Sequence, residues 1–288
     1  MKNKYSNNLC IILLSHNSAN NIKILLKQLR KINGEIFVID SGSSDGTLDI
    51  IKSLNIKYIK RSFKNYGDQR NWTIKKFNYF KWQLHIDSDE FPDKCLIKSI
   101  NEKVSDYTNE HAFLVKREDY FMGKKLKFSG INQLHLRLFR SNDAFCESSL
   151  YDQHFVSTHK AIKLKGALHD FSEINQNEWI KKHLRWAELE ANSIITNQQR
   201  ELGAELFNSS RERARLFKNF YYKTPTGYRA FIYFLYRYFL KLGFLDGKEG
   251  FYFCALQAFW FRVFIDFRLD NYNFKGFNYK NELKKILK

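Results

Sequence analysis

Three acidic residues that follow one apolar run could bind a metal ion. Asp87, Asp89 and Glu90 come after the run that ends at Ile86, and one residue separates the first two. Carboxylates gathered at the end of a buried strand repel one another and lose hydration, so they need a positive partner. Mg²⁺ and Mn²⁺ prefer oxygen ligands and are commonly held by one or two carboxylates together with substrate phosphates. The spacing therefore indicates a divalent metal bound together with a diphosphate.

The same acids also have a structural interpretation. Asp89, Glu90 and Pro92 could begin a helix, because acidic residues and proline are favoured in a first helical turn. An Asp-x-Asp spacing is weak evidence for a metal on its own. The arrangement of the neighbouring strands and helices has to distinguish a metal site from the start of a helix.

Two other apolar runs also end in polar residues. Residues 9–14 form a continuous apolar run before the polar segment at 15–18, and residues 35–39 form a run that ends at Asp40. Continuous apolar runs are typical of strands buried on both faces of a parallel sheet. Asp40, at a strand end, could accept hydrogen bonds from a base or a ribose, and turn formation is the alternative.

Strands and helices are expected to alternate through the first third of the chain. The pattern predicts strands at residues 9–14, 35–39, 57–59 and 83–86, and helices at residues 22–29, 47–54 and 69–77. Asp45 is placed to cap the second helix. This order predicts an α/β sheet with right-handed crossovers, in which ligands bind beyond the carboxyl ends of the strands. The three polar segments should converge on one crevice.

The rest of the chain has a different pattern. Residues 106–166 are mixed and richer in β-structure, and later residues are helical. Strands are expected at 112–116, 133–140 and 161–164, and helices at 179–200, 203–221, 228–242 and 250–267. A break at Pro225 separates the last two helices, which are aromatic, from the others. We expect a catalytic domain at residues 1–222 and a helical extension at residues 223–288.

The composition of the 288 residues limits the class of protein. Hydrophobic residues make up 44% and charged residues 27%, which is ordinary for a globular protein. The net charge of +18 predicts anionic partners such as nucleic acid, phosphorylated small molecules or an anionic membrane face, and a lysine-rich compositional bias is the alternative. No two of the four cysteines form a CxxC pair, which argues against a zinc site or a disulfide framework and suits a reduced cytosol. We expect neither a signal peptide nor a membrane-spanning helix.

Four segments in order resemble a known family, the family 2 glycosyltransferases with the GT-A fold. The matching segments are residues 12–17, 38–47, 67–71 and 86–90, of which the second is the most specific. Three later segments, at residues 137–140, 168–169 and 243–250, are similar to the bacterial lipopolysaccharide core β-1,4-glucosyltransferases. The resemblance covers most of the chain.

The resemblance implies a nucleotide-diphosphate sugar donor, namely a UDP-hexose, together with Mg²⁺ or Mn²⁺ and inversion at the anomeric carbon. Asp40 would contact the nucleobase, while Asp87 and Asp89 would hold ribose and metal. The remaining nucleotide-sugar contacts implied by the matching segments are Ser15, Asn17, Asp45 and Arg70.

Inverting transfer needs a general base, because the acceptor hydroxyl loses its proton as it attacks in a single displacement. The metal and cationic side chains stabilise the charge on the leaving diphosphate. The candidate region is residues 146–154, where the related enzymes carry a His-Glu pair and this chain has Asp152 and Gln153. A glutamine is no base, so Asp152 is the first candidate and Glu147 the second. A loop acid satisfied by backbone amides is the alternative for Asp152.

Three more residues are candidates with open alternatives. Arg70 could contact phosphate, pair with Asp45, or be a solvated surface arginine. Arg137 alternates with leucines and is expected to point away from the core, where it could contact phosphate or form a surface ion pair. The resemblance implies that His169 completes the metal site, and a structural hydrogen bond is the alternative.

The aromatic segments at residues 228–241 and 250–262 contain interleaved lysine and arginine. Such helices suit a membrane interface, and a hairpin packed on protein is the alternative. The expected acceptor is a lipid-linked glycan of the lipopolysaccharide core or another cell-envelope glycan. The expected location is cytoplasmic, peripheral on the inner face of the bacterial inner membrane.

Two alternative functions would require other sequence features. A sugar nucleotidyltransferase would need a glycine-rich phosphate loop after its first strand, and residues 15–20 contain no glycine. A basic nucleic-acid-binding protein would explain the charge, yet the sequence has no RNP-like, helix-turn-helix or zinc-finger pattern. Acids at the strand ends also oppose nucleic-acid phosphate. We therefore expect no nucleic-acid partner.

Overall fold

The computed structural model of the chain describes residues 8–105, 109–131, 133–147, 153–171, 176–196 and 221–273. The chain divides into two compact units, Met1–Glu173 and Ile174–Lys288, and each is described by itself. The expected domain boundary at residue 222 falls inside the second unit. Helix α5 (Gln176–Ile195), which the sequence analysis grouped with the catalytic domain, belongs to the same unit as the aromatic helices.

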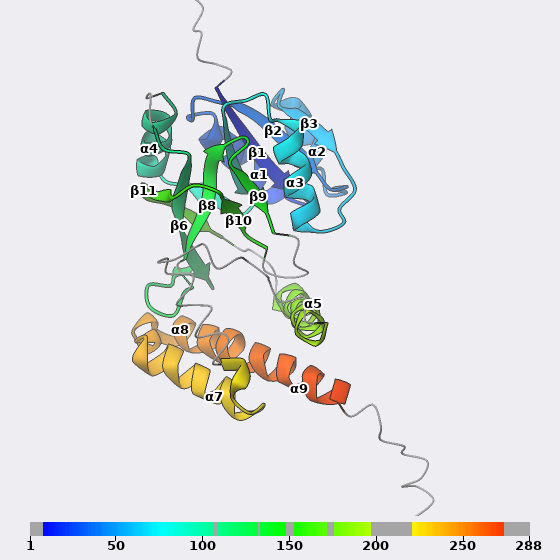
Figure 1. Cartoon of the computed structure of the whole chain (residues 1–288), viewed down its shortest axis with the longest axis vertical. Helices are drawn as coiled ribbons and strands as arrows, with labels where there is room; N and C mark the ends of the chain where they lie inside the picture. Colours follow the sequence, from blue (N-terminus) through cyan, green and yellow to red (C-terminus); the bar gives the residue numbers. More distant parts are fainter. Residues whose placement is uncertain are drawn as a thin grey trace, which may run out of the picture. The chain divides into compact units, whose positions relative to one another are not determined.

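The first unit is built on a nine-stranded sheet (Figure 1) with the order β3-β2-β1-β4-β8-β6-β11-β5, and β7 pairs with β6. Its strands are β1 (Leu9–Ser15), β2 (Glu35–Asp40), β3 (Lys57–Lys60), β4 (Trp82–Asp87), β5 (Glu90–Pro92), β6 (Ala112–Phe121), β7 (Lys124–Lys125), β8 (Leu134–Arg140) and β11 (Ala161–Asp170). A separate hairpin joins β9 (Ala144–Cys146) to β10 (Phe155–Ser157).

The direction of the strands divides the sheet into two parts. Strands β1 to β4 are parallel to one another, so Ser15 and Asp40 are register partners and Asp87 lies beside Leu14. β8 runs antiparallel to β4 and β6, and β11 is parallel to β6. The expected parallel first third and mixed second part are both confirmed. The carboxyl ends of β1, β2 and β4 lie at one edge, where the polar segments begin.

Helices cover both faces of the parallel part (Figure 1): α1 (Ala19–Leu29), α2 (Thr47–Ser53), α3 (Tyr66–Lys76) and α4 (Lys94–Ser105). All seven residues of β1 are buried, and successive side chains point to opposite faces. Leu9, Ile11 and Leu13 pack in one core with residues of α1 and α4. Cys10, Ile12 and Leu14 pack in another with Phe77 and Phe80, which follow α3. The continuous apolar run is therefore needed because both faces are covered.

The segment after the three acids is a strand, followed by a helix. Glu90 begins β5, which pairs with the end of β11, and α4 begins only at Lys94. Asp93 caps that helix, since its Oδ1 accepts a hydrogen bond from the backbone N–H of Leu96 at 2.6 Å. The interpretation of Asp89 and Glu90 as the start of a helix is therefore wrong. Neither β5 nor the β9–β10 hairpin was expected.

The second unit is helical in the residues that the structure describes. Besides α5 it contains α7 (Tyr228–Leu235), η1 (Tyr236–Leu240), η2 (Gly243–Asp246), α8 (Gly247–Phe253), η3 (Cys254–Trp260) and α9 (Phe261–Asn273). η1 and η3 are π-helical segments, so α7 continues through η1, and α8 through η3 into α9. The two expected aromatic helices correspond to these runs. The helix expected at residues 203–221 lies, except for Tyr221, outside the described residues.

Buried ion pairs hold these helices together. Arg229 Nη2 lies 2.5 Å from Asp266 Oδ1, and both side chains are 4% exposed. Arg262 on α9 pairs with Glu190 on α5 at 3.1 Å. Gly250 lies against Gly243, and a Cβ at Gly250 would lie 2.2 Å from the carbonyl oxygen of Gly243. Within the described ranges, every helix is too short or too polar to cross a bilayer.

Candidate active site

The polar segments after β1, β2 and β4 lie together, as expected. The Asn17 backbone N–H donates to Ser43 Oγ at 2.9 Å, and its side-chain Oδ1 accepts from the Ser44 N–H at 2.9 Å. Ser18 Oγ donates to Ser88 Oγ at 2.8 Å, which joins the first segment to the acidic one. Asn17 adopts a left-handed conformation (φ 48°), which asparagine tolerates better than most residues. Asn17 therefore orders the segment that joins β2 to α2.

Asp40 is fully buried and holds the turn that follows β2. Its Oδ1 accepts from the N–H groups of Gly42 and Ser43 at 3.0 and 2.9 Å, and its Oδ2 accepts from Ser43 Oγ at 2.5 Å. Ser15, its register partner on β1, is 3% exposed. The Ser15 hydroxyl has no hydrogen-bond partner among the described residues, which is unusual for a buried polar group and suits a bound ligand.

Asp45 holds the start of α2, as expected. Its Oδ1 accepts from the N–H and the hydroxyl of Thr47 at 3.1 and 2.5 Å, and its Oδ2 accepts from the Ala19 N–H at 2.9 Å. Slight burial acts to raise the pKa of Asp45, but the hydrogen bonds from Thr47 and Ala19 outweigh it and lower the pKa. Asp45 is thus an ionised cap that also ties α1 to α2.

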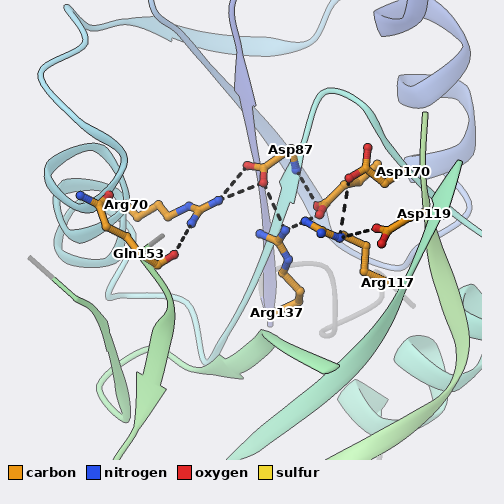
Figure 2. A network of polar contacts seen from close by, with 8 residues as sticks. Arg70, Asp87, Arg117, Asp119, Arg137, Gln153 and Asp170 are labelled. Carbon is orange, nitrogen blue, oxygen red and sulfur yellow. Dashed lines mark hydrogen bonds and ion pairs between the residues drawn. The ribbon is translucent and has the colours of Figure 1, made fainter. Parts of the chain in front are cut away.

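Asp87 lies between two arginines at the end of β4 (Figure 2). Arg70 Nη2 donates to its Oδ1 and Oδ2 at 3.1 and 2.9 Å, and Arg137 Nη2 donates to Oδ2 at 3.2 Å. Burial alone would raise the pKa of Asp87, but Arg70 and Arg137 hold it well below its ordinary value. Asp87 is therefore ionised at neutral pH. Arg70 pairs with Asp87 and not with Asp45, and it is 8% exposed, so it is no solvated surface arginine.

Glu90 is the second acid that pairs with Arg137. Its side chain is 3% exposed and forms an ion pair with Arg137, while its Oε2 accepts from the backbone N–H of Asp87 at 3.1 Å. Burial raises the pKa of Glu90 to about 7; Arg137 opposes this shift, and Asp87 and Asp89 add to it. The positive partners of the acidic segment therefore include two arginines of the chain itself.

The Arg137 side chain does not point away from the core, as had been expected. The alternation with leucines suggested a side chain directed away from the core, but Arg137 is 4% exposed and contacts Asp87 and Glu90. β8 lies in the middle of the sheet with α3 and the hairpin on that side, so both of its faces are covered. The same two acids raise the pKa of Arg137 although burial acts against them. Its charge is permanent.

A third arginine, Arg117, continues this network of ion pairs. Figure 2 shows Arg117 between Asp119 and Asp170, with its Nε 3.1 Å from Asp119 Oδ1 and 3.6 Å from Asp170 Oδ2. Asp170 is the register partner of both Asp119 and Glu90. The sequence analysis missed this group. Its signal was the alternation of Arg117 and Asp119 directly after the strand expected at residues 112–116, which extends to Phe121 as β6, so that both side chains share a face.

The region expected to hold the base lies against α3. Arg70 Nη1 donates to the Gln153 carbonyl oxygen at 3.3 Å, and Asn71 exchanges two hydrogen bonds with the Cys146 backbone at 2.7 and 2.8 Å. Glu147 is buried, and its Oε2 accepts from the His154 N–H at 3.2 Å. A Cβ at Gly67 would lie 2.5 Å from the Glu147 carbonyl oxygen. Asp152 lies outside the described residues, but its neighbour Gln153 contacts the arginine that holds Asp87.

His169 lies apart from Asp87. Its Nδ1 is 3.2 Å from Tyr120 Oη and 3.5 Å from Glu118 Oε2, and its Nε2 is 3.8 Å from Asp93. Side chains alternate along β11, so His169 points to the face opposite Asp170 and the Arg117 group. Asp89, in contrast, is partly exposed and follows Asp87 within the same loop. Asp87 and Asp89 are thus two residues apart at the end of β4, whereas His169 lies on the other face of β11.

A parallel half sheet with acids at its carboxyl edge and a mixed second half define an α/β protein of the GT-A fold. A sequence profile described as "Glycosyl transferase family 2" matches residues 10–162, more than half of the chain. The chain therefore belongs to glycosyl transferase family 2 and is a transferase enzyme. The expected family and fold are confirmed.

The chain is similar in sequence to two bacterial glycosyltransferases. It is 25% identical over 233 residues to the lipopolysaccharide core biosynthesis glycosyltransferase LpsC of Rhizobium meliloti (strain 1021), covering 78% of this chain and 76% of LpsC. It is 26% identical over 169 residues to an uncharacterized glycosyltransferase of Rickettsia bellii (strain RML369-C), of which it spans about half, 52%, with 57% of this chain covered.

Two solved structures are similar at low sequence identity. S. aureus TarS 1–349 has a TM-score of 0.41 at 16% identity, covering 92% of this chain and 91% of TarS. The mannosyltransferase PcManGT from Pyrobaculum calidifontis, in complex with GDP-Man and Mn²⁺, has a TM-score of 0.46 at 11% identity, covering 98% of this chain and 80% of PcManGT.

Proposed function

We propose that this enzyme transfers a hexose from a UDP-sugar to a lipopolysaccharide core or other cell-envelope glycan, with inversion and a divalent metal. The observation that carries the proposal is the ionised Asp87, held by Arg70 and Arg137 beside the turns that follow β1 and β2. An anionic donor needs a fixed arrangement of carboxylates, cations and hydroxyl groups at this edge. Similarity to LpsC over most of both chains supports the class of acceptor.

The donor set at this edge fits Mg²⁺ or Mn²⁺. Asp87 is ionised, Asp89 is a partly exposed carboxylate in the same loop, and hard divalent ions prefer such oxygen ligands. Two arginines already contact Asp87, so Asp89 is the better metal ligand and Asp87 the better partner for ribose. The metal would neutralise the diphosphate as it leaves. We leave His169 out of this ligand set because it faces the other side of β11.

The nucleoside would lie against the turns after β1 and β2. The Ser15 hydroxyl is buried and has no hydrogen-bond partner among the described residues, so it could contact the nucleoside only after a small movement, and Asp40 fixes the turn from which a base could be contacted. Asn17 and Asp45 would act by ordering that turn. Arg70, fixed by Asp87 and the Gln153 carbonyl, would place positive charge toward the diphosphate.

The base would come from the segment beside α3. Asp152 remains our first candidate, because Glu147 is buried and accepts a hydrogen bond from its own turn. A carboxylate there would accept the proton of the acceptor hydroxyl while the carbon–oxygen bond to the diphosphate breaks. Gln153, next in the chain, cannot take that role.

The acceptor would be lipid-linked, and the second unit would contact the inner face of the membrane. Its described helices expose many large apolar side chains, among them Tyr228 at 75%, Phe231 at 51%, Ile232 at 56%, Phe239 at 53% and Leu240 at 76%. Lys241 and Lys248 are exposed in the same stretch. An exposed apolar surface with nearby cations favours binding at the interface of an anionic bilayer.

The first test is thermal stability with UDP-, GDP-, CMP- and dTDP-sugars, each with Mn²⁺ and with EDTA. A ligand that binds the folded state raises the melting temperature. We expect a metal-dependent rise with a UDP-sugar that is absent in Asp89→Asn and retained in Asp49→Asn. Asp49 lies on α2, where its side chain is 83% exposed, so it is a matched control. A folded protein that responds to no nucleotide sugar would contradict the proposal.

A further inference from the structure

A second cluster of ligand-type side chains lies away from the proposed sugar-transfer site. His111 precedes β6, Asp143 lies in the turn between β8 and β9, and His159 lies in the turn between β10 and β11. One ligand atom from each of the three residues lies within 4.8 Å of the others. Residues from three separate connections have thus come together.

The cluster lies at the opposite edge of the sheet from Asp87. Arg140, three residues before Asp143, pairs with Trp82, which begins β4, whereas Asp87 ends that strand. Five residues of extended strand span about 16 Å. The two sites therefore share no ligand, and the carboxylates of one cannot serve the other.

Backbone hydrogen bonds fix the connections that carry the three residues. The Arg140 N–H donates to the His111 carbonyl oxygen at 2.9 Å, and the Asp143 N–H donates to the Arg140 carbonyl oxygen at 2.9 Å. The Thr158 N–H, next to His159, donates to the Asp143 carbonyl oxygen at 3.1 Å. The Cα positions are therefore set by the fold, which reduces the entropy lost when a ligand binds.

The three side chains meet around Asp143. His111 Nδ1 lies 2.6 Å from Asp143 Oδ2, and His159 Nε2 lies 3.8 Å from Oδ1, so each carboxylate oxygen is nearest to one histidine. The two imidazole rings stack at 3.9 Å with an angle of 21°. The 3.8 Å distance from His159 to Asp143 exceeds that of a hydrogen bond, so His159 forms no hydrogen bond with Asp143. The His159 side chain is 47% exposed, which leaves room for movement and for water.

We propose that His111, Asp143 and His159 bind one Zn²⁺ ion or a similar divalent transition metal, with water completing the coordination. Two imidazole nitrogens and one carboxylate oxygen favour Zn²⁺, Co²⁺ or Ni²⁺ over Mg²⁺, which prefers oxygen ligands. Ligand atoms around tetrahedral zinc lie about 3.3 Å apart, given bonds of about 2.0–2.2 Å. Metal binding would open the 2.6 Å contact between His111 and Asp143 to this distance, and the exposed His159 would rotate to bring its ligand atom from within 4.8 Å to the same distance.

The metal would serve to join connections, since Asp87, Arg70 and the other described residues of the sugar-transfer site lie at the other edge of the sheet. A metal there links the residues before β6, the β8–β9 turn and the β10–β11 turn. Metal ions compete with protons for the imidazole nitrogens, so the affinity falls as the pH falls. The metal stabilises the folded first unit by mass action and leaves donor binding unchanged.

The test uses the full chain without a histidine tag, freed of metal by a chelator that is then removed. Zn²⁺ is titrated by calorimetry with millimolar Mg²⁺ present, which occupies carboxylate sites at the other edge. Co²⁺ is titrated in parallel, because its visible absorption reports nitrogen ligation. We expect one Zn²⁺ per chain and a Zn²⁺-dependent rise in melting temperature. His159→Ala should weaken binding at least about tenfold, since even outer-shell changes cost that much.

Three further variants, compared with His159→Ala, decide the assignment. Asp143→Asn tests the carboxylate, His16→Ala removes an exposed histidine elsewhere, and Asp89→Asn removes the proposed sugar-site ligand. Binding that is lost in His159→Ala and Asp143→Asn, but kept in the other two, supports the site. No Zn²⁺ binding by the unsubstituted chain, or equal binding by His159→Ala and His16→Ala, overturns it. Loss in Asp89→Asn alone would place the zinc at the sugar site and also overturn it.

Discussion

One nitrogen of Arg70 contacts both carboxylate oxygens of Asp87, at 3.1 and 2.9 Å. The neighbouring nitrogen of the same guanidinium donates to the Gln153 carbonyl oxygen at 3.3 Å. Arg70 thus joins the end of β4 to the segment beside α3. The planar, permanently charged side chain of Arg70 therefore holds three elements together. They are the end of β4, helix α3 and the segment that contains Gln153.

Replacing Arg70 by lysine should weaken donor binding although the charge is kept. A lysine ammonium cannot contact Asp87 and Gln153 at once in the geometry of a guanidinium. We expect the KM for the donor to rise about tenfold to a hundredfold, the range for hydrogen bonds to charged groups. Arg30→Lys, at the end of α1, is the control in steady-state kinetics. An unchanged KM in Arg70→Lys would remove Arg70 from the donor site.

Replacing Arg137 by methionine should destabilise the protein strongly. Arg137 is buried with Asp87 and Glu90, and its removal leaves acids without their partner. Breaking a buried ion pair costs about 3–5 kcal/mol. Urea unfolding of the single variants and of Arg137→Met with Glu90→Gln measures the coupling. The double variant should recover part of the loss, and strictly additive effects would show that the two side chains do not interact.

The stability should depend on pH through Glu90. The folded state raises the pKa of Glu90 from 4.5 to about 7, so the folded state holds this proton more tightly than the unfolded chain. The contribution is therefore fully present below about pH 4.5 and is lost as the pH rises to about 7. Asp87, with a lowered pKa, acts in the opposite sense and loses its contribution in acid. Glu90→Gln should remove the decline between pH 4.5 and 7 in unfolding free energy, and a decline that persists would assign it elsewhere.

The parallel part of the fold could be predicted because its signals are local. The buried run of β1, the strand end at Asp40 and the cap at Asp45 depend on neighbours in the sequence, and each lies where it was expected. The partners of the acids could not be predicted in this way. Arg137 is 50 residues from Asp87, and an alternating pattern does not reveal that both faces of β8 are covered. The histidine cluster was not predicted because its residues lie in three separate connections, and metal ligands were expected only at Asp87, Asp89 and His169.

Replacing Gly67 by alanine should lower activity although alanine favours helices. In an unconstrained helix the change stabilises by about 0.4–1 kcal/mol. Here the added Cβ would lie 2.5 Å from the Glu147 carbonyl oxygen, so α3 and the segment before Asp152 must separate. We expect a lower kcat and a lower melting temperature, measured by donor turnover and thermal unfolding. A variant that is more stable and equally active would show that this contact does not matter.

The exposed apolar surface of the second unit should bind anionic vesicles. Leu240 is 76% exposed at the end of η1, next to the exposed Lys241. Leu240→Glu places a negative charge where the bilayer would lie. Binding to vesicles of phosphatidylglycerol should therefore fall about tenfold in co-sedimentation, because burial of one leucine contributes a few kcal/mol at most. Ile24→Glu, on α1 of the first unit and 59% exposed, is the matched control and should bind as the unsubstituted chain does. Equal binding by both variants would assign the attraction to the net charge of +18, and high salt would then abolish it.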